Sequence, residues 1–191
     1  AASGDVLTGV RVDQRPWFID GRAGPYVGDV HEAVLLAKRL APAKSTEPMR
    51  FVDFAAPVHG RDGTLLGVVA AHANWAWVDE VLASALPADA LERGIEVFIL
   101  ARDGSVLHPY AAIGTVRPPD DVLSEAAHVV LAWPGEGEFL TSHVRLKPTA
   151  VADLGWQIVV RQPRDKALVA VDELQHHLVW MGIVSTLFFV L

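Results

Sequence analysis

A basic residue beside two aromatic residues forms the first candidate site. Residues 14–18 read QRPWF, which places Arg15 two positions before Trp17. A guanidinium can hold a carboxylate through two parallel hydrogen bonds, and an indole offers a flat apolar wall or a cation–π face. The pattern is equally compatible with Trp17 and Phe18 in the core and Arg15 as a surface charge above them.

Two further polar side chains lie in apolar segments. Asp53 stands inside RFVDFAAPV, and His72 ends the run LLGVVAAH. A buried carboxylate needs a hydrogen-bond partner or a counter-charge, and Arg15 or a histidine would serve. A single histidine in a strand is more often a satisfied core residue than a ligand contact. The position of His72 alone therefore leaves both interpretations open.

Several other chemistries lack their sequence signals. The chain shows no nucleophile elbow, phosphate-binding loop, zinc-spaced histidine pair or dinucleotide fingerprint. It has no cysteine, and its net charge of -7 is opposite to that of a nucleic-acid-binding surface. Acidic pairs at 79–80 and 120–121 are interpreted as first-turn acids of helices. We predict no catalytic residue, no metal, no cofactor and no nucleic-acid partner.

The first half of the chain predicts an antiparallel hairpin with helices around it. The 191 residues are enough for one large or two small domains. Residues 7–12 have a β-like pattern, and residues 50–58 and 63–75 predict two strands joined by the turn HGRDG. Asp29 followed three positions later by Glu32 predicts a capping box for a helix that ends at Pro42. Asn74 is expected to cap the next helix.

The second half repeats this alternation and defines the fold class. Residues 95–101 and 105–110 predict a hairpin, residues 118–130 a helix, and residues 137–146 and 155–162 two more strands. The RDG sequence occurs at 61–63 and at 102–104, which we interpret as the same turn chemistry used twice. The pattern predicts an α+β fold with antiparallel sheets in two units, 1–90 and 91–162.

The C-terminal residues 163–191 predict a helix that leads into a membrane. After His177 come 14 residues without charge. A complete span needs about 20 apolar residues, so we interpret this run as the start of a truncated transmembrane helix. The alternative is a buried C-terminal helix.

The order RPWF…GPYVGDVHEA, then RFVDFAAPVHGRDGTLLGVVAAHANW, then a smaller hairpin unit, resembles a double Cache sensor domain. Such domains are the extracytoplasmic parts of bacterial chemoreceptors, sensor histidine kinases and membrane diguanylate cyclases. The resemblance implies two PAS-like modules: a membrane-distal, ligand-binding module at 1–90 and a membrane-proximal module at 91–162. It also implies that the sequence continues beyond both of its ends.

The resemblance also implies a ligand site. Arg15 and Trp17 match the R-x-W motif that holds the ligand carboxylate in amino-acid-binding members, whereas the motif's preceding tyrosine falls on Val10. The aspartate that binds the ligand amine falls on His72, and a further tyrosine falls on His31. These replacements favour a carboxylate that lacks an α-amino group. The expected ligand-binding residues are Arg15, Trp17, Phe18, Tyr26, Asp29, His31, Asp53 and His72.

The function implied is that of a periplasmic small-molecule sensor, part of a homodimeric receptor in the inner membrane and not itself an enzyme. Two alternatives remain open from the residues. One is an extracytoplasmic enzyme that uses His31, His72 and Asp53. The other is a structural or dimerisation module without a ligand.

Overall fold

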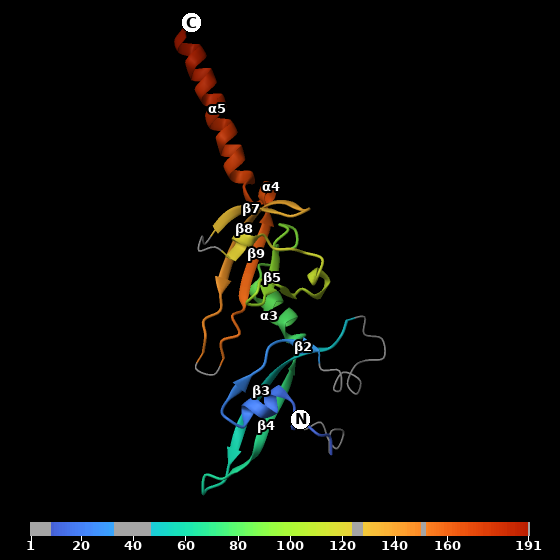
Figure 1. Cartoon of the computed structure of the whole chain (residues 1–191). Coiled ribbons are helices and arrows are strands. Elements are labelled where there is room, and N and C mark those ends of the chain that lie inside the picture. Colours follow the sequence, from blue (N-terminus) through green and yellow to red (C-terminus); the bar gives the residue numbers. More distant parts are fainter. Residues whose placement is uncertain (1–8, 33–46, 124–127, 150–151, 191) are drawn as a thin grey trace. The chain divides into compact units, whose positions relative to one another are not determined.

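The computed structural model describes residues 9–32, 47–123, 128–149 and 152–190. The chain divides into two compact units (Figure 1). The first contains Ala1–Leu86 and Leu146–Trp156, and the second contains Pro87–Arg145 and Gln157–Leu191. We expected residues 146–156 in the second unit. They instead belong to the first, although they join two strands of the second.

The first unit is built on an antiparallel hairpin of β3 (Arg50–His59) and β4 (Leu65–Asn74). Two short strands, β1 (Tyr26–Val27) and β2 (His31–Glu32), also pair antiparallel with β3. The hairpin confirms the strands predicted at 50–58 and 63–75. Alternating apolar residues and a glycine-rich turn are local signals, which is why the sequence suffices to find it.

Two predictions near the start of the chain are wrong. A strand was expected at 7–12, but residues 9–12 form none, and residues 7–8 lie outside the described residues. His31–Glu32 form a strand where we expected the first turn of a helix. The rest of that predicted helix lies outside the described residues. The Asp29 carboxylate accepts hydrogen bonds from the Val30 amide and the Trp156 indole. It is therefore engaged in a tertiary contact rather than in a capping box.

Helix α1 (Pro16–Gly21) lies against one face of the hairpin. Proline in the first turn suits this start, because its missing N–H has no intrahelical partner to lose. At the other end Gly21 is buried, and a Cβ there would lie 2.8 Å from the Ala55 Cβ and 3.0 Å from the Val68 Cγ1. The absence of a side chain thus allows the close approach that brings α1 onto the sheet.

Helix α3 (Trp77–Ala85) follows β4 directly. The expected cap by Asn74 is wrong: the N-cap residue is Ala76, and no side chain caps this end of the helix. The Oδ1 of Asn74 instead accepts a 3.0 Å hydrogen bond from the Ala76 amide, in the turn before the helix. The preceding Trp75 is buried, with 3% of its surface exposed. Its ring contacts the rings of Trp77 and Trp156 edge-on, at centroid distances of 5.8 and 5.1 Å. A cluster of three indoles therefore closes this end of the hairpin.

The second unit contains a separate five-stranded antiparallel sheet. In spatial order its strands are β6 (Val106–His108), β5 (Glu96–Leu100), β9 (Gln157–Pro163), β8 (Gly137–Arg145) and β7 (His128–Trp133). The β5–β6 hairpin and the strands predicted at 137–146 and 155–162 are confirmed.

The helix predicted at 118–130 is wrong in its second part. The acidic start does form a short 3-10 helix, η3 (Asp120–Leu123), and another, η2, covers Tyr110–Ala112. Residues 128–130, however, open strand β7, which pairs with β8. The HVVLAW segment alternates in burial as a strand does, and pairing with β8 prevails over the helix-like start.

One face of this sheet carries the core of the second unit. Its buried members include Trp133, Phe139 and Val159, and the two 3-10 helices contribute Ala112 and Val122. Leu100 and Val159 have no exposed surface. Large apolar side chains from five strands and two short helices thus meet in one cluster, as an independent domain core requires.

The two RDG sequences form the same turn, as expected. In segments 60–64 and 101–105 the amide of the first residue donates a hydrogen bond to the main-chain oxygen of the last, at 2.8 Å in both. The glycines, Gly63 and Gly104, have φ of 82° and 85°, a conformation that costs a glycine little and other residues more. The same turn geometry therefore explains why RDG occurs twice, and no internal repeat of the surrounding sequence is needed.

The carboxyl groups of Asp62 and Asp103 should titrate below their ordinary value. The Thr64 and Ser105 hydroxyls, followed by the amides of the same residues, donate to them and lower each pKa from 3.8. Because the ionised form is favoured by the fold, each turn gains stability above the unfolded pKa and loses it as the pH falls through the lower, folded value. Carboxyl carbon NMR titration checks this, and Thr64→Val and Ser105→Ala should raise the respective pKa values.

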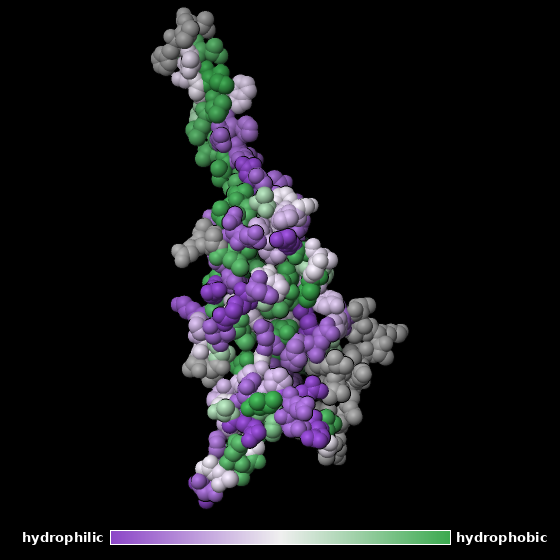
Figure 2. Space-filling model, viewed as in Figure 1, coloured by the Kyte–Doolittle hydropathy of each residue, from purple (hydrophilic) through white to green (hydrophobic). Residues whose placement is uncertain are grey.

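The chain ends in helices α4 (Arg164–Ala167) and α5 (Val169–Val190). Apolar side chains are exposed along α5 (Figure 2), among them Trp180, Met181 and Phe188, of which 64%, 61% and 79% of the surface is accessible. Of the helices within the described residues, none combines the length and the apolar character that crossing a membrane requires.

Candidate functional site

Four of the expected site residues lie on one face of the first sheet. Residues directly opposite in an antiparallel pair share a face, and Asp53 lies opposite His72. His31 and Tyr26 lie opposite Phe51 and Ala55, each two positions from Asp53 along β3. The same face is covered by α1, because Gly21 meets Ala55 there. The sheet thus gathers side chains that are up to 46 positions apart in sequence.

Asp53 is the centre of this group. Only 5% of its surface is exposed. Its Oδ1 lies 2.5 Å from the Nδ1 of His72, and its Oδ2 lies 3.4 Å from the Nε2 of His31. The buried carboxylate therefore has two histidines as partners. This resolves the alternatives that the sequence left open, since Arg15 is not its partner.

The ring of His72 is oriented by two contacts. A carboxylate oxygen only accepts, so the Nδ1 of His72 carries the proton of the bond to Asp53. The ring also meets Trp17 edge-on, with centroids 5.6 Å apart. Trp17 in turn contacts Phe18 edge-on at 5.8 Å, and both aromatic residues are half-buried. A neutral His72 then presents Nε2 as an acceptor, and a protonated His72 presents it as a donor.

His31 faces oxygen atoms with both ring nitrogens. Its Nδ1 lies 2.9 Å from the main-chain oxygen of Asp29, and its Nε2 faces Asp53. Both oxygens are acceptors, so both contacts are attractive together only when the ring carries two protons. The two contacts hold the His31 ring between the main chain of Asp29 and the carboxylate of Asp53.

Arg15 and Asp29 are placed differently from the central group. Arg15 precedes α1, where its main-chain oxygen accepts bonds from the Phe18 and Ile19 amides. Its side chain is exposed and has no hydrogen-bond or ion-pair partner among the described residues. Asp29 contributes its main chain to the contact with His31 and its carboxylate to Trp156. The carboxylate of Asp29 is thus occupied by another contact.

Trp156 is the residue that sequence reasoning missed. Its Nε1 donates a 2.8 Å hydrogen bond to the Oδ1 of Asp29. The only local signal is an aromatic residue after Gly155 at the start of a strand, which is common. Nothing in the sequence relates it to a loop more than a hundred positions earlier.

Tyr26 lies beside this group with a raised pKa. Partial burial raises the pKa above 10.0, and the negative charges of Asp20, Asp53 and Asp29 raise it further. The neutral phenol is therefore favoured by the fold, and this contribution is complete below the unfolded pKa and lost as the pH rises through the folded one.

We expect the tyrosinate absorbance of Tyr26 to appear above pH 10, the ordinary tyrosine value. Tyr26→Phe identifies this component, since the chain has only one other tyrosine. Asp20→Asn should move the midpoint of the Tyr26 titration to lower pH because it removes the largest of the three charge contributions. An unchanged midpoint would show that the carboxylate does not act on the phenol.

The described residues contain no group of three histidine, aspartate or glutamate side chains arranged to hold a metal ion. Asp53 forms a hydrogen-bonded ion pair with His72 and a longer ion pair with His31.

Neither a family model nor a curated protein matches the sequence. Solved structures do match the fold. The ligand-binding domain of the Pseudomonas fluorescens chemoreceptor CtaA, in complex with L-isoleucine, is 16% identical with a TM-score of 0.52, over 85% of this chain and 63% of that chain. The ligand-binding domain of the Pseudomonas aeruginosa PAO1 amino acid chemoreceptor PctB, in complex with L-Arg, is 14% identical with a TM-score of 0.53, over 89% and 63%.

A third match is the extracellular domain of mmHK1S-Z3, a protein assigned as a histidine kinase. It is 16% identical with a TM-score of 0.52, over 86% of this chain and 59% of that chain. The chain thus spans about 60% of the length of these structures. Together they show the fold of extracytoplasmic sensor domains of chemoreceptors and histidine kinases, as the sequence resemblance predicted.

Proposed function

We propose that this chain is the extracytoplasmic sensor domain of a membrane receptor and that its first unit binds a small carboxylate. The observation that carries the proposal is the His31–Asp53–His72 group beside Trp17, on a sheet that α1 covers. A buried acid held by two histidines fixes an imidazole edge next to an aromatic wall. Sensor domains with this fold that bind amino acids support the assignment.

The two groups proposed to bind the carboxylate are His72 and Arg15. The Nδ1 proton of His72 is used by Asp53, so a second proton on Nε2 is needed before the ring can donate to an anion. Arg15 has no partner among the described residues and is close in sequence to Trp17, which contacts His72. The Nε2 edge of His72 and the Arg15 guanidinium should therefore both contribute to carboxylate binding, and calorimetry of the single variants measures each contribution.

The first step of the test is a thermal-shift screen of carboxylates, amino acids and amines. With the ligand found, Arg15→Ala and His72→Ala should each weaken binding at least tenfold, which is about 1.4 kcal/mol. Arg22→Ala and His59→Ala are matched controls, because both side chains are exposed and have no contact with Asp53 or Trp17 among the described residues. Arg22 follows α1 as Arg15 precedes it, and His59 ends β3, the strand that pairs with β4. Calorimetry measures the affinities. If both site variants bind as well as the parent protein, the site is assigned wrongly.

The two-module arrangement, the membrane and the homodimer are further parts of the proposal. The separate sheets support a ligand-binding first module and a second module that carries the signal. The exposed apolar side chains of α5 support an attachment to a lipid bilayer in the full-length receptor. Flotation with lipid vesicles tests the attachment, and sedimentation of the domain tests the dimer.

A second candidate function is hydrolysis. The Asp53–His72 pair has the arrangement in which a carboxylate orients an imidazole as a general base. The described residues place no serine or threonine hydroxyl in contact with His72, so the base would have to activate water. Turnover of an ester panel that is lost in His72→Ala would favour this candidate over the sensor.

A further inference from the structure

The hydrogen bond between Trp156 and Asp29 joins residues 127 positions apart. Trp156 is the last residue of the connection between β8 and β9, two strands of the second sheet. This connection nevertheless belongs to the first unit. The bond therefore ties the β8–β9 connection to the loop that precedes His31.

We propose that Trp156 is a positioning residue of the candidate site, which orients His31 through Asp29. The inference rests on the proposed function, because it assigns Trp156 to the same site. The indole Nε1 donates to the Oδ1 of Asp29 at 2.8 Å, and the main-chain oxygen of Asp29 accepts from His31 at 2.9 Å. His31 then faces Asp53 with its other nitrogen at 3.4 Å. Trp156 thus restricts the position of Asp29, and Asp29 restricts the orientation of the His31 ring.

The indole is well suited to hold this loop in one position. The indole N–H can only donate a hydrogen bond, and a carboxylate oxygen can only accept one, so the direction of this bond is fixed. The same Oδ1 of Asp29 also accepts from the Val30 amide at 2.7 Å, which fixes the carboxylate from two directions. The ring of Trp156 contacts buried Trp75 at 5.1 Å. The donor is thus held by packing and not only by its own hydrogen bond.

A backbone hydrogen bond joins the two ends of the connection. The main-chain oxygen of Trp156 accepts a 2.9 Å hydrogen bond from the Leu146 amide, where the connection begins. A displacement of Trp156 would therefore also displace Leu146. These two residues adjoin the first residue of β9 and the last residue of β8. The same residue that positions His31 can report changes at the site to these two strands.

The test compares two tryptophans that contact the same ring. Trp156→Phe keeps an aromatic ring beside Trp75 and removes the N–H donor. Trp77→Phe is the control, because Trp77 also meets Trp75 edge-on, at 5.8 Å, but makes no hydrogen bond through its indole within the described chain. The ring ¹⁵N shifts of His31, which report hydrogen bonding and tautomer, should move towards those of a solvent-exposed imidazole in Trp156→Phe and stay unchanged in Trp77→Phe.

Substitutions of Asp29 give the second half of the test and leave all indoles intact. Asp29→Ala removes the acceptor and should reproduce the shift of the His31 signals. Asp29→Asn keeps a side-chain oxygen for Trp156 and should restore the parent spectrum. Unchanged His31 signals in Asp29→Ala would overturn the proposal, and so would identical spectra of the two Asp29 variants. If Trp156→Phe does not fold, this pair still decides.

The reciprocal effect tests the link to the β8–β9 connection. His31→Ala removes the contact with the Asp29 main chain and should speed hydrogen exchange of the Leu146 amide at least threefold, whereas His59→Ala should not. An unchanged Leu146 rate would overturn the link. Both measurements use the ligand-free protein. A ligand screen without a hit would therefore reject the proposed function while these results still decide whether Trp156 positions His31.

Discussion

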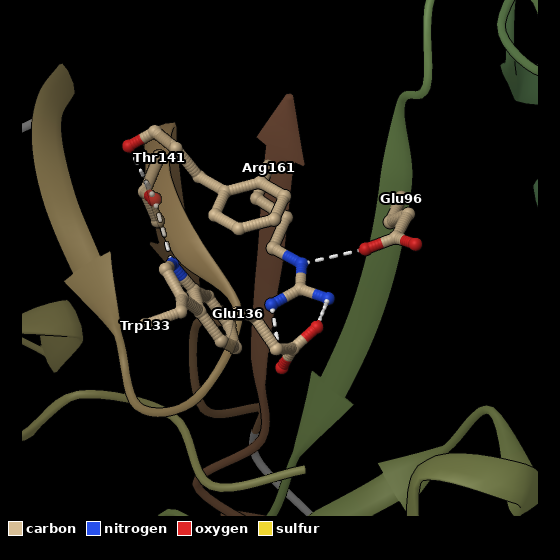
Figure 3. A network of polar contacts seen from close by, with 6 residues as sticks. Glu96, Trp133, Glu136, Thr141 and Arg161 are labelled. Carbon is tan, nitrogen blue, oxygen red and sulfur yellow. Dashed lines mark hydrogen bonds and ion pairs between the residues drawn. The ribbon is translucent and has the colours of Figure 1, made fainter. Parts of the chain in front are cut away.

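Replacing Arg161 with alanine should lower the free energy of unfolding of the second unit by about 2 kcal/mol or more. Arg161 is 3% exposed and is held by two acids (Figure 3). Its Nε donates to Glu96 at 2.6 Å, and its two terminal nitrogens donate to both oxygens of Glu136 at 3.1 and 2.6 Å. Alanine would leave both carboxylates without their cation and a cavity in the core.

Contacts between the Arg161 guanidinium and aromatic rings would be lost as well. The guanidinium carbon of Arg161 lies 4.9 Å from the ring centroid of Phe98 and 4.2 Å from those of Trp133 and Phe139. The indole of Trp133 is fixed in turn by a 3.1 Å hydrogen bond to the buried Thr141. A desolvated cation–π contact contributes about 2 kcal/mol. Because three rings surround the guanidinium, the planar cation is part of the core packing.

The matched control is Arg164→Ala. Arg164 is half exposed and lies 3.7 Å from Glu138, so its loss should cost less than about 1 kcal/mol. Native-state hydrogen exchange is the measurement, because it reports each unit separately. In Arg161→Ala the amides of β5, β8 and β9 should lose protection while those of β3 and β4 keep theirs. Equal effects of the two arginine substitutions would contradict the role of Arg161.

The sequence could have identified Arg161 by the rule that found Asp53. Both are charged residues inside apolar strands, one in QIVVRQ and the other in RFVDFAAPV. Such a charge needs a partner, and for Asp53 the expected histidine partner is present. The same reasoning applied to Arg161 predicts an acidic partner, although it does not identify Glu96 or Glu136 among the acids of the chain.

The parts that the sequence did not predict depend on contacts between distant residues. Asp29 and Glu32 have the spacing of a capping box, but the Asp29 carboxylate is bound by Trp156, and Glu32 lies in a strand. The acidic start at 120–121 lies in the 3-10 helix η3, and residues 128–133, expected to continue a helix as far as 130, pair with β8 instead. In both places a contact with a distant partner outweighs the local helix signal. The sequence shows the local signal but does not show which distant residue will be the partner.

Replacing Asp53 with alanine should destabilise the first unit by about 1–3 kcal/mol and abolish the proposed carboxylate binding. The cost arises because the Nδ1–H of His72 loses its acceptor in a mostly buried position. The Nε2 of His31 loses its ion pair with the Asp53 carboxylate, at 3.4 Å. Without Asp53 the ring of His72 is also free to leave the orientation in which it faces Trp17.

Asp53→Asn separates the hydrogen bonds from the charge. Asparagine has the same shape, its Oδ1 can still accept from His72, and its amide can donate to an unprotonated Nε2 of His31. Its stability cost should therefore be below about 1 kcal/mol, and ligand affinity should fall less than in Asp53→Ala. Amide exchange of β3 and β4 measures the stability, and calorimetry measures the affinity. If Asp53→Asn is as damaging as Asp53→Ala, the negative charge rather than the hydrogen-bond geometry holds the two histidines in place.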